Sequence, residues 1–182
     1  MSQIAIKGAT TGTGVFTLES PATNTDRTLI LPDEAGTVLT SASNVAQKGV
    51  PAFSAYQSSA QTLSSATFTK IQLQAEEFDT ANCFDSTTNY RFTPTVAGYY
   101  MITGSLAVSS FVTQIILSIY KNGVLLKEGF NNTGSGHPNM TALIYLNGTT
   151  DYVELYAWLS GGQALSAGSA YTYFQGVLVR AA

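Results

Sequence analysis

The chain has very little charge, and this scarcity limits what it can bind. Only 10% of its 182 residues are Asp, Glu, Lys or Arg, whereas roughly a quarter is usual in globular domains. The eight Lys and Arg residues are scattered along the chain, and the net charge is −3. Nucleic-acid binding requires clustered basic residues that displace counterions. The composition therefore predicts no nucleic-acid partner.

Cysteine and histidine each occur once, as Cys83 and His137. A single thiol cannot form a disulfide within the chain or a multi-thiolate metal site. His137 lies in a Gly- and Asn-rich stretch at residues 131–139, which is poor support for a catalytic base. No pair of acids is placed to face each other across a groove, as glycoside hydrolysis requires. We therefore predict that the chain is not an enzyme and holds no cofactor.

Four acidic residues leave a bound calcium ion as an alternative to a chain without any cofactor or metal. Carboxylates suit Ca²⁺, so a calcium site is conceivable, although their spacing does not resemble an EF-hand. Adjacent residues on an extended chain also point to opposite sides. The favoured interpretation is that these residues are solvated acids in turns. They are Glu76, Glu77, Asp79 and Asp85.

The sequence also lacks an N-terminal signal-peptide pattern and any apolar run near the roughly 18 residues that a membrane span needs. We expect a chain made in the cytoplasm and not inserted into a membrane. Such a protein can still act outside the cell in which it is made.

What the sequence does contain is a series of short β-type segments rich in Tyr and Phe, of which there are 10 and 9. Residues 1–44 are Thr-, Gly- and Pro-rich, and their segments are too short to bury much surface alone. From residue 45 onward the segments lengthen, and no window shows apolar residues at helical spacing. We predict an all-β chain with an N-terminal segment at 1–44 and a head domain at 45–182.

Turn signals organise the head into antiparallel strands. Asn122-Gly123 between two apolar runs predicts a hairpin, and Asn147-Gly148 marks a second turn. In the strand predicted at 99–109, Tyr100, Ile102 and Leu106 share one face. Eight or nine such strands with regular turns indicate a sandwich or jelly roll.

Several apolar and aromatic side chains are expected on the outside of this sandwich. The favoured interpretation is that they form a patch buried in a symmetric oligomer, because the patch is too apolar for solvent. The alternative is scattered aromatics on the surface of a monomer. The predicted interface residues are Leu143, Tyr145, Tyr171, Tyr173 and Val177.

Two long polar loops, predicted at 128–139 and 160–169, are the candidates for binding. Aromatic rings beside amide and hydroxyl groups are suited to neutral glycans. Trp158 precedes the second loop and either packs on the sheet or adjoins the site. The predicted receptor-binding residues are Phe130, Asn131, Asn132, His137, Gln163 and Ser166.

Residues 50–182 resemble the globular-head family of the first complement component, which shares the tumour-necrosis-factor-like jelly roll. The resemblance implies an antiparallel, ten-stranded jelly-roll sandwich that assembles as a tight homotrimer. It departs from the family pattern at Asn89, Ala97 and Val177. The segments that carry it are Pro51-Ala52-Phe53-Ser54-Ala55-Tyr56, Phe84-Asp85-Ser86-Thr87-Thr88-Asn89-Tyr90-Arg91-Phe92-Thr93, Ala97-Gly98-Tyr99-Tyr100, Tyr120-Lys121-Asn122-Gly123 and Tyr173-Phe174-Gln175-Gly176-Val177-Leu178-Val179.

A second resemblance covers residues 16–40, which include Thr28-Leu29-Ile30-Leu31-Pro32-Asp33-Glu34-Ala35-Gly36-Thr37-Val38-Leu39-Thr40. This segment looks like one common in bacteriophage tail-fibre and virion appendage proteins. It implies a short fibre on the phage particle, made in the host cytoplasm. Residues 1–44 would dock on another virion protein, and the head would attach to a host surface polysaccharide. The alternatives are a capsid or baseplate decoration protein without host binding, and a depolymerase.

Overall fold

In the computed structural model of the chain, the described residues are 50–131 and 137–182, together with the isolated positions 11, 13, 17, 22, 24–26 and 28. Of residues 130 and 131 only the backbone is described. The chain divides into two units, Met1–Val38 and Leu39–Ala182. The predicted anchor at 1–44 falls almost entirely outside the described residues, so its role and its boundary at residue 44 stay predictions.

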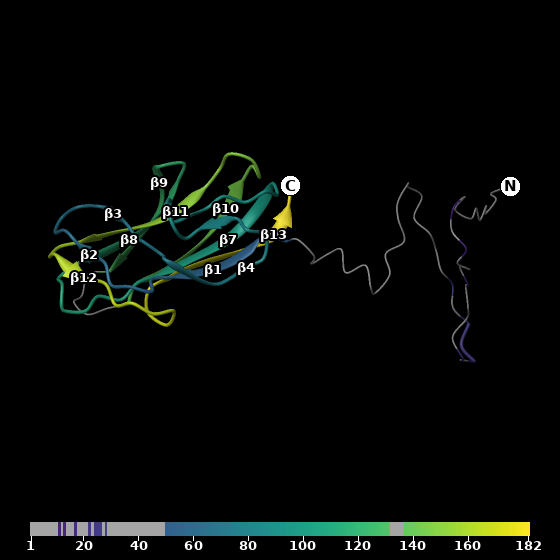
Figure 1. Cartoon of the computed structure of the whole chain (residues 1–182), viewed down its shortest axis with the longest axis horizontal. Coiled ribbons are helices and arrows are strands. Elements are labelled where there is room, and N and C mark those ends of the chain that lie inside the picture. The colour runs from purple at the N-terminus through teal and green to yellow at the C-terminus, as the bar shows by residue number, and fades with distance from the viewer. Residues whose placement is uncertain are drawn as a thin grey trace. The chain divides into compact units, whose positions relative to one another are not determined.

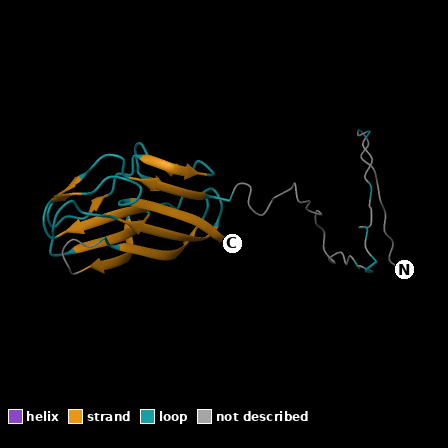
Figure 2. Ribbon diagram, turned by 90° about the horizontal axis from the view of Figure 1, so that it is seen from below, coloured by secondary structure: helices purple, strands orange, loops and turns teal. Residues whose placement is uncertain are grey.

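The described part of the second unit is an antiparallel β-sandwich (Figures 1 and 2). It confirms the predicted all-β, jelly-roll class. In the described ranges, no helix has the length and apolar character required to cross a membrane. The strands are β1 (Ala52–Tyr56), β2 (Thr62–Leu63), β3 (Thr69–Lys70), β4 (Ala75–Asp79), β5 (Phe84–Asp85), β6 (Arg91–Phe92), β7 (Gly98–Ser105), β8 (Ile115–Lys121), β9 (Val124–Asn131), β10 (Asn139–Leu146), β11 (Val153–Leu159), β12 (Gln163–Ala164) and β13 (Tyr173–Ala181).

Two large sheets form the layers of the sandwich. The β7 sheet has the order β10-β7-β13-β1-β4, and the β11 sheet has the order β5-β6-β11-β8-β9, with β3 also paired to β11. A small third sheet joins β12 to β2. The C-terminal strand β13 lies between β1 and β7, so strands far apart in the sequence are neighbours. Pairing between such distant segments slows folding, because a long loop has to close before the strands can meet.

The core lies between the two large sheets and is filled by alternate residues of each strand. Tyr100 and Ile102 of β7 are fully buried, as is Leu106, which confirms the predicted shared face. The ring of Phe53 stacks on that of Phe92 at 4.3 Å between centroids. Burying a side chain of this size contributes about 1.5–3 kcal/mol to folding. Apolar residues occur at every second position of the long strands because only those side chains face this core.

The two Asn-Gly turns have different roles. Asn122 and Gly123 have φ values of 54° and 76° and close the predicted β8–β9 hairpin as a turn of the type favoured by Asn-Gly. The Asn147-Gly148 turn instead carries the chain from β10 in one sheet to β11 in the other. Its geometry is held by the Asn147 side-chain oxygen, which accepts the N–H groups of residues 149, 150 and 151. The Asn147-Gly148 turn therefore connects two sheets and does not close a hairpin.

Three segments differ from the sequence expectation. The acids Glu76 and Glu77 lie in β4, the edge strand of the β7 sheet, and not in a turn. An edge strand keeps charged residues solvated and discourages pairing with other chains. The alternation of residues 67–73 predicts a strand there, but only Thr69–Lys70 form one, as β3. The strand β9 continues to Asn131, so the first predicted binding loop begins four residues later.

Candidate functional site

Three of the six predicted binding residues, His137, Gln163 and Ser166, lie at the end of the sandwich where β2 and β12 pair, away from the C-terminus (Figure 1). Pairing of β12 with β2 brings Gln163 opposite Leu63. The backbone N–H of Leu106 donates to the carbonyl of Pro138 at 3.2 Å, which places His137 at the same end. We call this region the loop end.

The predicted loop residues have different surroundings. Gln163 is half-buried in β12. Ser166 is also half-buried, and its N–H donates to the Ala107 carbonyl at 2.8 Å. His137 is exposed, with its ring centroid 6.3 Å from that of Tyr171. A ligand could therefore reach His137 more easily than Gln163 or Ser166, and the role of all three in binding stays a prediction.

The remaining predicted binding residues do not lie in a described loop. Phe130 and Asn131 belong to β9, where their backbones pair with Ile116 and Ile115. Asn132 lies outside the described residues. In the sequence these residues adjoin a polar stretch. Pairing with β8 extends β9 through them, and the local sequence does not indicate this pairing.

Phe111 is an exposed residue of the loop end that the sequence interpretation did not single out. Its side chain is 68% exposed. Two residues earlier, the N–H of Ser109 donates to the Ala164 carbonyl at 2.9 Å, which ties this loop to β12. The neighbouring Val112 is buried and anchors the other side. In the sequence, Ser109 and Ser110 directly precede Phe111, and this polar setting could have indicated that the ring is exposed.

The outer face of the β7 sheet carries three of the five predicted interface residues at adjacent positions. In the strand register Leu143 and Val177 each pair with Met101, one on each side. Tyr145 pairs with Tyr99, and their ring centroids are 5.5 Å apart. The side chains of this row, Leu143, Tyr145, Val177, Tyr99 and Met101, are all exposed. This continuous apolar row also includes Tyr99 and Met101, which the alternation of the strand could have indicated.

The other two predicted interface residues lie further along. Tyr173 belongs to β13 on the same face but pairs with Ser105, at the start of the strand and four residues before Val177. Tyr171 precedes β13 in a turn, where its N–H donates to the Gly168 carbonyl at 3.0 Å. The predicted patch is therefore split between a sheet face and the loop end.

A shallow groove of about 280 Å³ crosses the same outer face. Phe78 of β4 forms part of it, and its side chain is 50% exposed. The groove is mainly apolar, so its water is readily displaced by an apolar partner. Its lining residues are Ala52, Phe53, Phe78, Met101, Thr103, Gln175, Gly176 and Val177.

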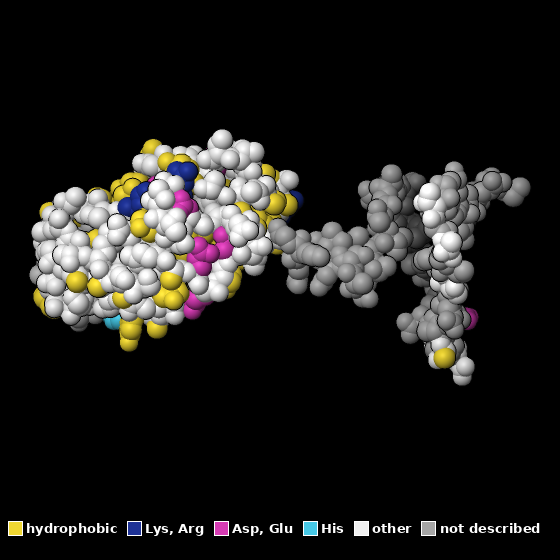
Figure 3. Space-filling view, viewed as in Figure 1, with side chains coloured by type: hydrophobic (Ala, Val, Ile, Leu, Met, Phe, Trp, Pro, Cys, Tyr) yellow, Lys and Arg dark blue, Asp and Glu magenta, His cyan; other side chains and the backbone are white. Residues whose placement is uncertain are grey.

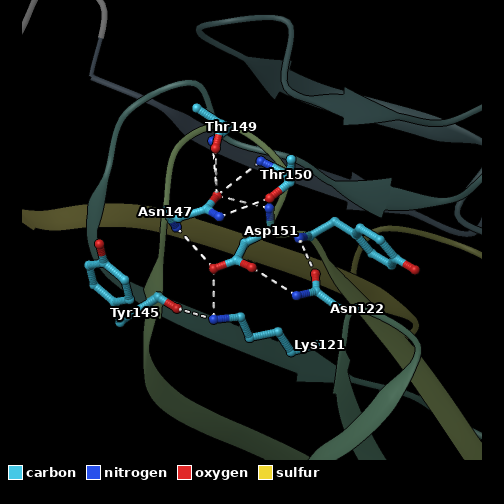
Figure 4. A network of polar contacts seen from close by, with 8 residues as sticks. Lys121, Asn122, Tyr145, Asn147, Thr149, Thr150 and Asp151 are labelled. Carbon is cyan, nitrogen blue, oxygen red and sulfur yellow. Dashed lines mark hydrogen bonds and ion pairs between the residues drawn. The ribbon is translucent and has the colours of Figure 1, made fainter.

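At the end opposite the loop end, a polar network joins the two sheets (Figure 4). Asp151 is almost fully buried, and one carboxylate oxygen lies 2.8 Å from the Lys121 ammonium. The other accepts a hydrogen bond from the Asn122 side-chain amide at 2.8 Å. Lys121 also donates to the carbonyl of Tyr145 at 2.9 Å. Since Lys121 belongs to β8 and Tyr145 to β10, the network links both layers.

This network changes the protonation of Asp151. Burial opposes ionisation, but bonds from Lys121, Asn122 and the backbone N–H of Asn147 outweigh it and lower the pKa of Asp151. At neutral pH the carboxylate is therefore ionised and fully engaged. The arrangement is structural, because its polar atoms are directed at one another.

The acids considered as calcium ligands are also engaged locally. The Asp85 carboxylate accepts the N–H groups of Thr87, Thr88 and Asn89. The bond from Thr88 is the largest of the effects that lower the pKa of Asp85. Asp79 accepts the N–H of Phe84 at 2.7 Å. Within the described ranges, no three or more His, Cys, Asp or Glu side chains are grouped to hold a metal ion.

Known proteins share the fold of this head. The globular domain of zebrafish complement 1qA has a TM-score of 0.54 at 17% identity, covering 73% of this chain and 99% of that one. Murine APRIL has a TM-score of 0.56 at 10% identity, covering 71% and 98%. The PRD1 vertex protein P5 has a TM-score of 0.51 at 14% identity, covering 72% and 99%. The head therefore has the jelly-roll fold of complement 1q and tumour-necrosis-factor-like proteins.

The comparisons at the level of sequence identify no relative. No protein-family model matches the chain, and no curated protein matches it. Because fold does not by itself imply function, the role of the chain has to be argued from its surfaces.

Proposed function

We propose that the chain is a non-enzymatic virion protein, a homotrimeric fibre whose head attaches to a glycan on the host cell surface. The observation that carries the proposal is the continuous apolar row on the outer face of the β7 sheet. Leu143 is 55% exposed and Val177 44% exposed, on either side of Met101. Monomers rarely leave such a patch in water.

Assembly into a trimer removes this patch from solvent. Sparse charge leaves little repulsion between copies. On the face of the head in Figure 3, basic and acidic side chains form only small clusters among uncharged ones. Three copies with closed symmetry would bury the patch three times over, as expected for an obligate interface.

The two ends of the trimer have different tasks in this proposal. Residues 1–44 dock on another virion protein, as their likeness to phage appendage sequences suggests. The head is carried away from the particle, where three copies of one weak glycan site act together. Such multivalency raises avidity by a factor on the order of 10²–10⁴.

A second candidate is a decoration protein of the capsid or baseplate. The fold similarity to the PRD1 vertex protein P5 favours it, since that protein belongs to a particle vertex. In that role the same trimer would reinforce the particle and would bind no host glycan.

Electron cryo-microscopy of the particle, with an antibody against the head, tests both candidates. The fibre predicts labelled heads that project from the tail at low copy number. The decoration protein predicts labelled trimers lying flat at many capsid positions or around the baseplate. Purified protein should also adhere to host cells and release no reducing ends from their polysaccharide. Release of reducing ends would indicate a depolymerase instead.

A further inference from the structure

The outer face of the β11 sheet carries tyrosines that the interface does not use. Strand alternation sends Leu117 and Ile119 of β8 into the core and therefore sends Tyr120 outward. In β11, Tyr156 points outward for the same reason. We call this surface the tyrosine face; it consists of Phe68, Lys70, Arg91, Ser118, Tyr120, Tyr152, Glu154 and Tyr156.

The rings of the tyrosine face are held in place by one another. Tyr120 and Tyr156 stack with centroids 4.0 Å apart and an angle of 23°. Phe68 lies 6.4 Å from Tyr120, and the Arg91 guanidinium carbon lies 4.2 Å from the Tyr152 ring centre. These side chains are only partly buried. A partner therefore meets an aromatic surface that is already ordered, which reduces the entropy lost on binding.

The charges of the tyrosine face nearly cancel, with no excess of cations. The Lys70 ammonium lies 2.6 Å from the Glu154 carboxylate and also donates to the Asn89 carbonyl at 3.2 Å. Arg91 pairs in register with Asp85, so two cations face two anions. At the edge, Glu128 pairs in register with Ser118 and adds one negative charge, whereas Lys127 pairs with the inward-facing Ile119 and points to the other side. An acidic polymer or nucleic acid would find no basic cluster here.

A buried hydroxyl on this face lacks a partner. Ser118 is fully buried, and its hydroxyl bonds to no group of the described residues. Ser118 pairs in register with Tyr156, so it lies beneath the ring cluster. Buried polar groups nearly always have a protein or water partner. Because Ser118 is closed off from solvent, a ligand hydroxyl or a bridging water completes it only where binding moves the ring that covers it.

We propose that the tyrosine face binds a neutral hexopyranose chain. The apolar face of a sugar ring packs against the tyrosines, and their phenol groups bond to sugar hydroxyls, since tyrosine has both an apolar body and a polar end. The inference rests on the proposed attachment to a glycan, and it places the contact on the side of the head and not at the loop end. The tyrosine face and the apolar row belong to opposite layers of the sandwich, so trimer assembly leaves the tyrosine face open.

The test is binding of the full-length protein to immobilised neutral oligomers of glucose, galactose, mannose and N-acetylglucosamine, beside acidic polygalacturonate. Tyr156→Ala should weaken binding to a neutral oligomer by at least about tenfold, the loss typical of an anchor ring. Tyr156→Phe and Ser118→Ala should each weaken it by about threefold, the effect of one hydrogen bond. Both keep the fold intact, which thermal unfolding checks. Phe111→Ala, which removes an exposed ring outside the tyrosine face, is the matched control and should bind like the wild type. His137→Ala and Gln163→Ala test the loop end as the competing site.

The outcomes separate this inference from the proposed function. Loss in the tyrosine-face variants alone supports both. Loss in the loop-end variants alone, or binding to polygalacturonate only, overturns the tyrosine face but retains glycan attachment. Binding to no neutral oligomer overturns the inference, and adhesion to intact host cells then decides the proposed function separately.

Discussion

The Lys70 ammonium lies 2.6 Å from the Glu154 carboxylate, and Glu154 is only 3% exposed although it faces the outside of the β11 sheet. The pair therefore connects the short strand β3 to the central strand β11 through a contact shielded from water. An ion pair of this kind is expensive to break from one side, because the remaining charge stays buried.

Removing the cation alone should destabilise the head. We expect Lys70→Met to lower the free energy of unfolding by about 2 kcal/mol, less than for a fully buried pair because Lys70 is partly solvated. The double variant Lys70→Met/Glu154→Leu should recover much of the loss, since no charge is left unpaired. Urea unfolding of the wild type, Lys70→Met, Glu154→Leu and the double variant measures the coupling energy between the two side chains. Strict additivity of the two single changes would contradict a specific pair.

Asp151 should make the stability of the head depend on pH. Its lowered pKa means that the folded state favours the ionised carboxylate, so the stabilisation is present above about pH 4 and is lost as the pH falls below it. Asp85 contributes in the same direction. We expect Asp151→Asn to be less stable at pH 7 and to lose less stability on acidification than the wild type. Parallel pH profiles for the two proteins would mean that Asp151 does not act in this way.

The two glycines that follow asparagine should respond differently to alanine. Gly148 has a φ of 71°, and an added Cβ would collide with the backbone of Val96 and Ala97. Gly123 has a similar φ of 76°, but its Cβ would meet nothing closer than 3.7 Å. Gly123→Ala should therefore cost about 1 kcal/mol for the left-handed backbone alone. Gly148→Ala should cost at least about 2 kcal/mol more in thermal unfolding. Equal losses would show that the backbone of residues 96–97 yields easily.

A charge in the apolar row should dissociate the proposed trimer. Val177→Glu would place a carboxylate among the apolar side chains of this row, and we expect trimer formation to weaken by at least about 100-fold. Leu125→Glu is the matched control, because Leu125 is 45% exposed, close to the 44% of Val177, but lies in β9 of the other sheet. Light scattering on the full chain measures the mass. A wild-type monomer at micromolar concentration, or a trimer unaffected by Val177→Glu, would count against this interface.

Much of the fold could be predicted because it depends on local patterns. The Asn122-Gly123 hairpin needs only two residues that tolerate positive φ between apolar runs. The inward faces of β7 and β11 follow from alternation, which is a property of any extended chain beside a core. The same alternation placed Leu143, Tyr145 and Val177 outside, where the structure has them.

Other features depend on which strands become neighbours. The sequence around Asn147-Gly148 resembles a hairpin, yet the turn joins two sheets because β10 pairs with β7 and β11 with β8. Likewise, nothing local shows that β3 brings Lys70 to Glu154, or that Tyr120 stacks on Tyr156. These contacts join residues tens of positions apart. The sequence by itself determined strand identity and sidedness, since these are decided by neighbours along the chain. Only the tertiary structure decided strand pairing, the apolar row and the tyrosine face, because burial and partnership depend on distant segments.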